Sequence, residues 1–205
     1  WLERLEAASS AIRARLDDES SLIDSHVSLT TCNRFELYFE TDDFHRSLDT
    51  VVEAIAAETN ENRDSVSRAL QILSGDKVAQ HLFSVTSGLD SMIVGESEVT
   101  GQVRRALSRA QLSGPLAPSV QQLFQTALRV SKKVSHTTGI GSSGKSVITT
   151  ALKLSEPMMP QGGPKQVLII GTGAYARVVT AFFKKTEAGD IAVYSGSGRA
   201  EMFAE

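Results

Sequence analysis

The residues most suited to chemistry form the run Thr31-Cys32-Asn33-Arg34, which holds the only cysteine of the chain. On both sides of this run, apolar side chains occupy odd positions and polar ones occupy even positions. Side chains alternate between the two faces of a strand, so the pattern places the Cys32 thiol on one face with Arg34 and Glu36. A nearby guanidinium favours the thiolate, the nucleophilic form. We therefore predict that Cys32 is a nucleophile; the alternative is a small, inert, buried cysteine. Asn33 has the parity of the apolar positions, which indicates a break or bulge there.

Composition limits the class of protein. With 205 residues, 41% of them hydrophobic, the chain can form one large domain or two small ones and is not expected to be disordered. One cysteine excludes an internal disulfide framework and fits a reducing, cytoplasmic setting. No apolar run approaches the roughly 20 residues that span a bilayer, and we expect no membrane contact and no metal site. The net charge of -3 gives no global attraction for nucleic acid, so an RNA partner would need a local basic patch. Such a patch is possible along Arg104, Arg105, Arg109, Arg129, Lys132 and Lys133.

The pattern of apolar residues predicts the elements that must position these groups. Helical spacing indicates helices around residues 2–16, 44–55, 66–73, 76–83 and 99–107, then 123–128 and 146–154. Ser119 is expected to cap the helix that follows Pro118. The segment from Pro157 to Pro164 is rich in proline and glycine and is the clearest candidate for a domain boundary. We expect an α/β architecture: a mixed α+β domain over residues 1–143, followed by an incomplete Rossmann-type nucleotide-binding domain over residues 144–205.

A glycine motif follows the proline- and glycine-rich segment. Residues 166–170 form a short apolar strand that leads directly into a glycine turn and a helix, Gly171-Thr172-Gly173-Ala174-Tyr175-Ala176. Such a turn lets the backbone approach a pyrophosphate, whose charge rests on the helix N-terminus. A second strand, residues 191–194, ends near Arg199, which would tolerate a 2′-phosphate and favours NADP over NAD. The motif therefore predicts dinucleotide binding; the alternative is a plain strand–helix turn.

Residues 139–146 also match a nucleotide pattern, the phosphate-cradling loop of triphosphatases, which ends in Gly144-Lys145-Ser146. That loop must follow an apolar strand, and the residues that precede it here are polar with a helical period. A P-loop nucleotide triphosphatase therefore remains an alternative that the context disfavours.

A series of short motifs runs through the first half of the chain: Thr31-Cys32-Asn33-Arg34-Phe35-Glu36-Leu37-Tyr38, His81-Leu82-Phe83, Ser87-Gly88-Leu89-Asp90-Ser91, Gly95-Glu96 and Gly101-Gln102-Val103. In this order and at these spacings they resemble the N-terminal half of the glutamyl-tRNA reductases. Those enzymes catalyse the first step of the five-carbon route to tetrapyrroles such as haem.

The resemblance implies an activity. Members of the family reduce glutamyl-tRNA(Glu) to glutamate-1-semialdehyde with NADPH, so residues 1–143 would be the catalytic, substrate-binding domain. By analogy Cys32 attacks the ester and forms a thioester, and His81 orients groups or transfers a proton. Arg34 would bind the substrate carboxylate, and Glu96 its α-ammonium group. The implied substrate contacts are Thr31, Cys32, Asn33, Arg34, Ser91, Glu96, Ser97, Glu98 and Gln102. The family usually has glutamine where this chain has Glu98, whose charge would repel a glutamate.

The resemblance also implies partners. It suggests a homodimer formed through a C-terminal region absent from this chain, and glutamate-1-semialdehyde aminotransferase as a possible partner enzyme. Because the first residue is Trp1, we expect that the natural beginning is missing as well. The remaining alternative is a non-catalytic protein that binds tRNA or a partner on a reductase-like scaffold.

Overall fold

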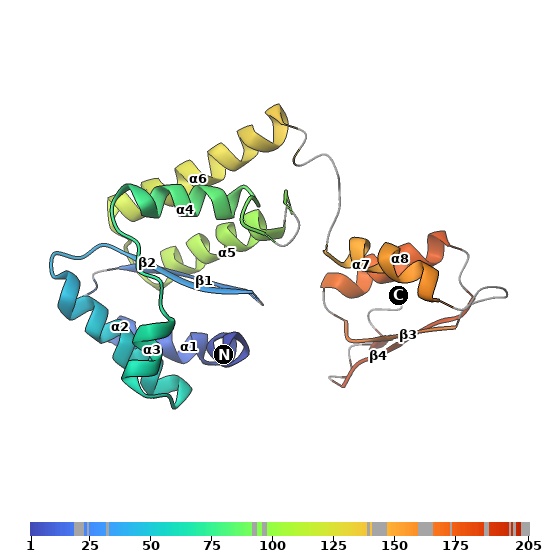
Figure 1. Ribbon diagram of the computed structural model, residues 1–205, viewed down its shortest axis with the longest axis horizontal. Helices are drawn as coiled ribbons and strands as arrows, with labels where there is room; N and C mark the ends of the chain where they lie inside the picture. Colours follow the sequence, from blue (N-terminus) through green and yellow to red (C-terminus); the bar gives the residue numbers. More distant parts are fainter. Residues whose placement is uncertain are drawn as a thin grey trace. The chain divides into compact units, whose positions relative to one another are not determined.

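The computed structural model describes the chain except for residues 19–22, 24, 32, 92–93, 96–97, 139, 141–146, 160–165, 173, 187–188, 197, 199 and 202–205. The chain forms two compact units, Trp1–Ser142 and Ser143–Glu205. The described residues are mostly helical, with one two-stranded sheet in each unit, so the predicted mixture of α and β structure is confirmed (Figure 1). None of the described helices is both long and apolar enough to cross a membrane.

The first unit is built on a β-hairpin. Strands β1 (His26–Thr31) and β2 (Arg34–Phe39) pair antiparallel with Thr31 opposite Arg34, so the chain reverses direction between these two residues. The break expected at Asn33 is confirmed, but the interpretation of one continuous alternating strand is wrong. Because the chain turns back, odd-numbered residues of β1 share a face with even-numbered residues of β2. Alternation therefore no longer argues for the placement of the Cys32 thiol, and Cys32 itself lies outside the described residues.

Each face of the hairpin packs against its own helices (Figure 1). The face that carries Tyr38 joins a hydrophobic core with α4 (Asp76–Thr86), α5 (Glu98–Ser113) and α6 (Pro118–Thr137). The opposite face, which carries Leu37, joins a second core with α1 (Leu2–Asp18), α2 (Phe44–Thr59) and α3 (Arg63–Ala69). The hairpin is thus a middle layer between two layers of helices.

The helix ends follow local capping chemistry. α2 begins after Asp43, whose side chain accepts a backbone hydrogen bond, and ends at Asn60, which has a left-handed backbone with φ of 54°. α3 begins before the helix predicted around residues 66–73 and also ends before it, at Ala69. The cap predicted at Ser119 is wrong, because α6 already begins at Pro118, a residue suited to the first helical position.

The second unit contains a strand–helix–strand arrangement. Its elements are α7 (Val147–Ser155), the 3-10 helix η2 (Glu156–Met158), β3 (Val167–Ile170), α8 (Ala174–Lys185) and β4 (Ile191–Tyr194). β3 and β4 pair in parallel, and α8 joins them and packs against β3, which confirms the predicted strand, turn and helix. α7 packs against α8, so the proline- and glycine-rich segment 157–164 lies within this unit and does not separate the two units.

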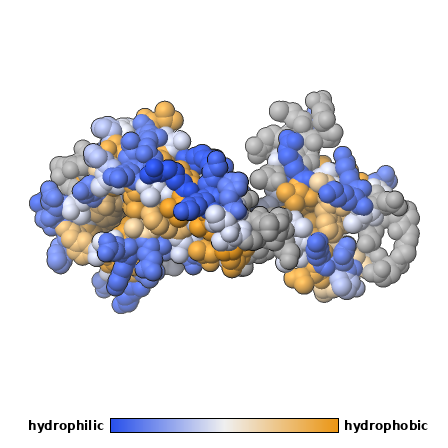
Figure 2. Space-filling view, turned by 90° about the horizontal axis from the view of Figure 1, so that it is seen from above, coloured by the Kyte–Doolittle hydropathy of each residue, from blue (hydrophilic) through white to orange (hydrophobic). Residues whose placement is uncertain are grey.

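One face of the small parallel sheet is apolar and exposed. Leu168 and Ile170 of β3 are 64% and 77% exposed, and Tyr194, which pairs with Ile170, is 60% exposed. The alternate residues Val167 and Ile169 are less exposed. Figure 2 shows hydrophobic side chains among the hydrophilic ones on the viewed face of each unit.

Gly95 is a position where the fold of the first unit requires glycine. Its φ of 87° lies in the left-handed region, and its N–H donates to the backbone oxygen of Gly88 at 2.9 Å. A β-carbon at Gly95 would collide with the backbone oxygen and the side chain of Ile140. The close approach holds the turn before α5 against the segment that follows α6.

Replacing Gly95 with alanine should destabilise the first unit more than the same change at Gly75. Gly75 also has a positive φ, 58°, but a β-carbon there would meet nothing within 4 Å. We expect a loss of about 1 kcal/mol at both positions from the backbone conformation. At Gly95 a further loss of about 1–3 kcal/mol is expected from the collision. Urea unfolding followed by circular dichroism measures both variants, and equal losses would contradict this account.

Candidate active site

The turn of the hairpin is held by the side chain of Thr31. Its Oγ1 accepts hydrogen bonds from the backbone N–H of Asn33 at 3.2 Å and from that of Arg34 at 3.1 Å. Threonine hydroxyls commonly stabilise turns in this way. Thr31 is buried and Asn33 is exposed. One buried hydroxyl therefore holds the backbone of Asn33 and Arg34, and Asn33 is exposed to solvent.

Arg34, the first residue of β2, is anchored by two acidic residues. Its Nη1 donates to Glu36 Oε1 at 2.7 Å and lies 3.5 Å from Asp90 Oδ2, and its Nη2 donates to the backbone oxygen of Asp90 at 2.7 Å. The side chains of Arg34 and Glu36 are each 15% exposed, so solvent screens this ion pair less than a surface pair.

A guanidinium carries five N–H donors, and these contacts leave part of Arg34 available. Within the described part of the chain, its Nε–H and one Nη2 hydrogen have no hydrogen-bond partner. The guanidinium edge made of Nε–H and one Nη2 hydrogen is a fork that can bind both oxygens of a carboxylate. Arg34 is therefore fixed to the protein through Nη1 and Nη2, and its Nε–H has no partner among the described residues.

The Glu36 carboxylate joins three donors. Besides Arg34, it lies 3.1 Å from Nε2 of His81, and its Oε2 accepts from the Tyr38 hydroxyl at 2.5 Å. An ionised carboxylate only accepts, so His81 Nε2 carries a proton and Nδ1 is the nitrogen left to accept one. Burial, followed by the charge of Glu36, raises the pKa of Tyr38, so its hydroxyl remains a donor. Glu36 thus sets the orientation of Arg34 and of His81 together.

Buried contacts connect this cluster to the helices. The ring of Tyr38 packs edge-to-face on Phe124 of α6, with ring centroids 5.1 Å apart. The backbone oxygen of Thr86, at the end of α4, accepts from Thr100 Oγ1 of α5 at 2.8 Å and from Ser131 Oγ of α6 at 2.9 Å. These bonds fix the end of α4, and with it the start of the loop that brings Asp90 to Arg34.

The predicted substrate-binding residues are brought together only in part. Ser91 directly follows the residue whose backbone binds Arg34. Glu98 and Gln102 lie four residues apart near the start of α5, and no hydrogen bond or ion pair in the described part of the chain joins them to Arg34. Glu98 lies in the first turn of α5, where a helix favours negative charge. The other predicted members lie outside the described residues: Cys32, Glu96 and Ser97.

Three residues of the cluster had no role in the sequence-based prediction: Glu36, Tyr38 and Asp90. The sequence of β2 indicates the first two of them. Glu36 and Tyr38 come two and four residues after Arg34, so their polar groups lie on the same face of the strand as Arg34. The sequence gives no comparable signal for Asp90, which lies 56 residues from Arg34 and reaches it only through the tertiary fold.

The predicted nucleotide motif lies at the turn after β3. Gly171 has φ of 111°, its N–H donates to the backbone oxygen of Tyr194 at 2.8 Å, and a β-carbon there would meet nothing within 4 Å. The other described members of the motif occupy the turn and the first turn of α8: Thr172, Ala174, Tyr175 and Ala176. Gly173 and Arg199 lie outside the described residues. An open glycine turn at a helix N-terminus is suited to a phosphate.

Among the described residues, no group of three or more His, Cys, Asp or Glu side chains would hold a metal ion.

The triphosphatase alternative is not favoured. The chain before residues 139–146 forms α6, which continues to Thr137, and a helix, α7, begins at Val147. A triphosphate-cradling loop requires a strand at its start.

Comparison with known proteins identifies the family. The model of the N-terminal domain of glutamyl-tRNAGlu reductase matches residues 1–138, more than half of the chain. The chain belongs to the glutamyl-tRNA reductase family. The glutamyl-tRNA reductase of Clavibacter michiganensis subsp. michiganensis is 39% identical over 99% of this chain and 47% of its own length. That of Kocuria rhizophila is 41% identical over 87% of this chain and 42% of its own length.

A solved structure has a similar fold. Glutamyl-tRNA reductase from Methanopyrus kandleri matches with a TM-score of 0.62 and 27% identity, over 100% of this chain and 49% of that one. The chain thus spans about half the length of the glutamyl-tRNA reductases that it matches.

Replacing Glu36 with glutamine should destabilise the first unit by about 2–4 kcal/mol, because the largely buried Arg34 loses its closest charge partner and three donors share one amide oxygen. The matched control is Glu61→Gln, which removes a carboxylate paired with Arg4 at 2.6 Å on the surface. We expect a loss of about 1 kcal/mol or less there. Urea unfolding measures both, and a Glu36 variant as stable as the Glu61 variant would contradict the role given to this carboxylate.

Proposed function

We propose that the protein carrying this chain is an NADPH-dependent glutamyl-tRNA reductase. It reduces the glutamyl ester of tRNA(Glu) to glutamate-1-semialdehyde, the first step of tetrapyrrole biosynthesis by the five-carbon route. The observation that carries the proposal is the anchoring of Arg34, two residues after Cys32, by Glu36 and Asp90, with its Nε–H left without a partner among the described residues. A receptor for a carboxylate beside a cysteine suits a substrate that carries both a carboxylate and an acyl group open to attack.

Covalent catalysis divides the reduction into two easier steps. The Cys32 thiolate attacks the ester carbonyl, a carbon–sulfur bond forms, and the carbon–oxygen bond to the terminal ribose breaks and releases tRNA. The resulting thioester accepts hydride more readily than an ester does. Its reduction gives a thiohemiacetal, and cleavage of the carbon–sulfur bond then releases the aldehyde and restores the thiol. During these steps Arg34 would hold the substrate carboxylate and so fix the carbonyl relative to Cys32.

His81 is proposed to move the protons. Its Nε2 faces Glu36, which keeps the ring in one orientation and leaves Nδ1 as the site that accepts a proton. Nδ1 would take the Cys32 proton and return it to the ribose oxygen that leaves. Thr31 and Asn33 would shape the pocket, and Ser91, Glu96, Ser97, Glu98 and Gln102 would complete the substrate contacts.

The second unit is proposed to be the start of a Rossmann-type domain that binds NADPH. The parallel pair β3 and β4 with α8 between them supports this proposal, because a Rossmann fold is built from such units, and the open turn at Gly171 leaves room for a pyrophosphate. The exposed apolar face of this sheet also fits, since a Rossmann sheet is covered by helices on both faces. Bound NADPH would supply the hydride, and Arg199 would favour its 2′-phosphate.

Further partners are proposed on the family resemblance. The full-length protein would form a homodimer through a region beyond this chain, and would pass its aldehyde to glutamate-1-semialdehyde aminotransferase. A thiolate nucleophile must stay reduced, which suits a cytoplasmic protein.

Incubating the full-length protein with glutamyl-tRNA(Glu) and no NADPH should give a glutamyl adduct on Cys32, detected by denaturing mass spectrometry. The Cys32→Ser variant is the control. It should carry no thioester and reduce the substrate at least about 10³-fold more slowly, because the nucleophile is lost. A serine variant that reduces substrate at the normal rate would refute the mechanism.

A further inference from the structure

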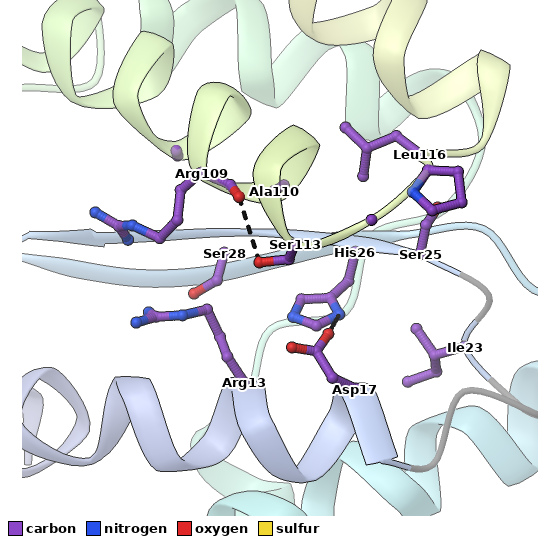
Figure 3. Close-up of a pocket in the computed structure, with 13 residues that line it drawn as sticks. Arg13, Asp17, Ile23, Ser25, His26, Ser28, Arg109, Ala110, Ser113 and Leu116 are labelled. Carbon is purple, nitrogen blue, oxygen red and sulfur yellow. Dashed lines mark hydrogen bonds and ion pairs between the residues drawn. The ribbon is translucent and has the colours of Figure 1, made fainter.

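A cavity of about 240 Å³ lies beside β1, and its lining includes neither Arg34 nor Glu36 (Figure 3). α1 lines one side with Arg13 and Asp17, and α5 lines the other with Arg109 and Ser113. β1 contributes Ser28 and His26 between them. None of the residues that line it belongs to the proposed catalytic or cofactor set.

Two arginines from different helices share this cavity. In Figure 3 the guanidinium groups of Arg13 and Arg109 point to the same end of the cavity, where Ser28 also lies. Burial, and then the positive charge of Arg109, lower the pKa of Arg13. Two cations on opposite walls repel each other, and an anion bound between them would reduce this repulsion.

Arg13 also lacks a partner for a buried donor. Its Nη1 is shielded from solvent and has no hydrogen-bond partner within the described part of the chain. A buried N–H group of a charged side chain is expensive to leave unpaired, and native proteins usually satisfy such groups with protein, water or ligand. Because Nη1 is closed to solvent, a ligand in the cavity would meet the other polar atoms of Arg13.

The remaining groups leave the cavity positively charged. Among the described residues that line it, Asp17 is the one acidic residue, and its Oδ1 lies 3.7 Å from Nδ1 of His26. Burial lowers the pKa of His26, with Asp17 acting against this shift and Arg13 acting with it, which favours the uncharged ring. Two arginines thus face a single carboxylate, and the hydroxyls of Ser28 and Ser113 supply further polar contacts.

We propose that this cavity is a binding site for a phosphate group. A carboxylate presents two oxygens in one plane and is saturated by one guanidinium, whereas the oxygens of a phosphate point in several directions and can bind guanidinium groups on two walls. The space exceeds that of one phosphate, so the group can be free or carried by a larger molecule. The site does not depend on the proposed reductase activity.

Calorimetric titration of inorganic phosphate into the 205-residue chain, at constant ionic strength, tests the proposal. We expect Arg13→Gln and Arg109→Gln each to weaken binding at least about tenfold. Arg104→Gln removes the same charge from the exposed surface of α5, outside the cavity, and should change affinity less than about twofold. Arg109 is exposed, so its variant should fold even if loss of Arg13 disturbs the core. Absence of phosphate binding, or equal affinity in all three variants, would overturn the proposal.

A second titration identifies the source of the phosphate. A short single-stranded RNA with a free 3′-hydroxyl is added to the phosphate-loaded chain. If RNA displaces phosphate from the unmodified chain but no longer binds to Arg109→Gln, the site is supported and its ligand is a phosphodiester. Retention of phosphate would support it with a free phosphate or a small phosphorylated molecule.

Discussion

The candidate active site depends on one largely buried carboxylate. Glu36 accepts hydrogen bonds from Arg34, His81 and Tyr38, and the first two of these side chains are the groups expected to touch substrate. An ionised carboxylate that is largely shielded from water is stable only when charged and hydrogen-bonding partners surround it. The same requirement fixes the partners, because each must reach Glu36. Tyr38 also packs on Phe124 of α6, so the polar cluster is fixed in position relative to that helix.

This arrangement changes the role that Arg34 is expected to play. From the sequence, its charge near Cys32 suggests a lowered thiol pKa. In the structure that charge is already compensated by Glu36 at 2.7 Å and approached by Asp90 at 3.5 Å. Two acidic neighbours reduce the positive potential that a thiolate would feel. The proposed contribution of Arg34 is therefore mainly geometric: three contacts hold its guanidinium in place, so it would bind a substrate carboxylate without first ordering a flexible side chain.

The sequence predicts the local elements better than their partners. Apolar spacing correctly indicates α1, α2 and α4, and the strand–turn–helix motif at Gly171 forms as expected. The hairpin was missed because a turn between Thr31 and Arg34 reverses parity, and alternation alone does not reveal a reversal. Segment 157–164 resembles a linker in composition, yet the packing of α7 on α8 places it inside a unit. Asp90 and the Arg13 cavity arise from tertiary contacts between distant segments, which no local pattern encodes.

The central claim is that Arg34 is a prearranged receptor for the substrate carboxylate. It is tested most directly by comparing the rates at which glutamyl-tRNA and glutaminyl-tRNA acylate Cys32 in the full-length protein, because the two acyl groups differ by a carboxylate against an uncharged amide. The account predicts that the wild-type protein prefers the glutamyl ester by about 10²-fold or more, and that Arg34→Gln loses most of this preference. An Arg34→Gln protein that discriminates as well as the wild type would contradict it.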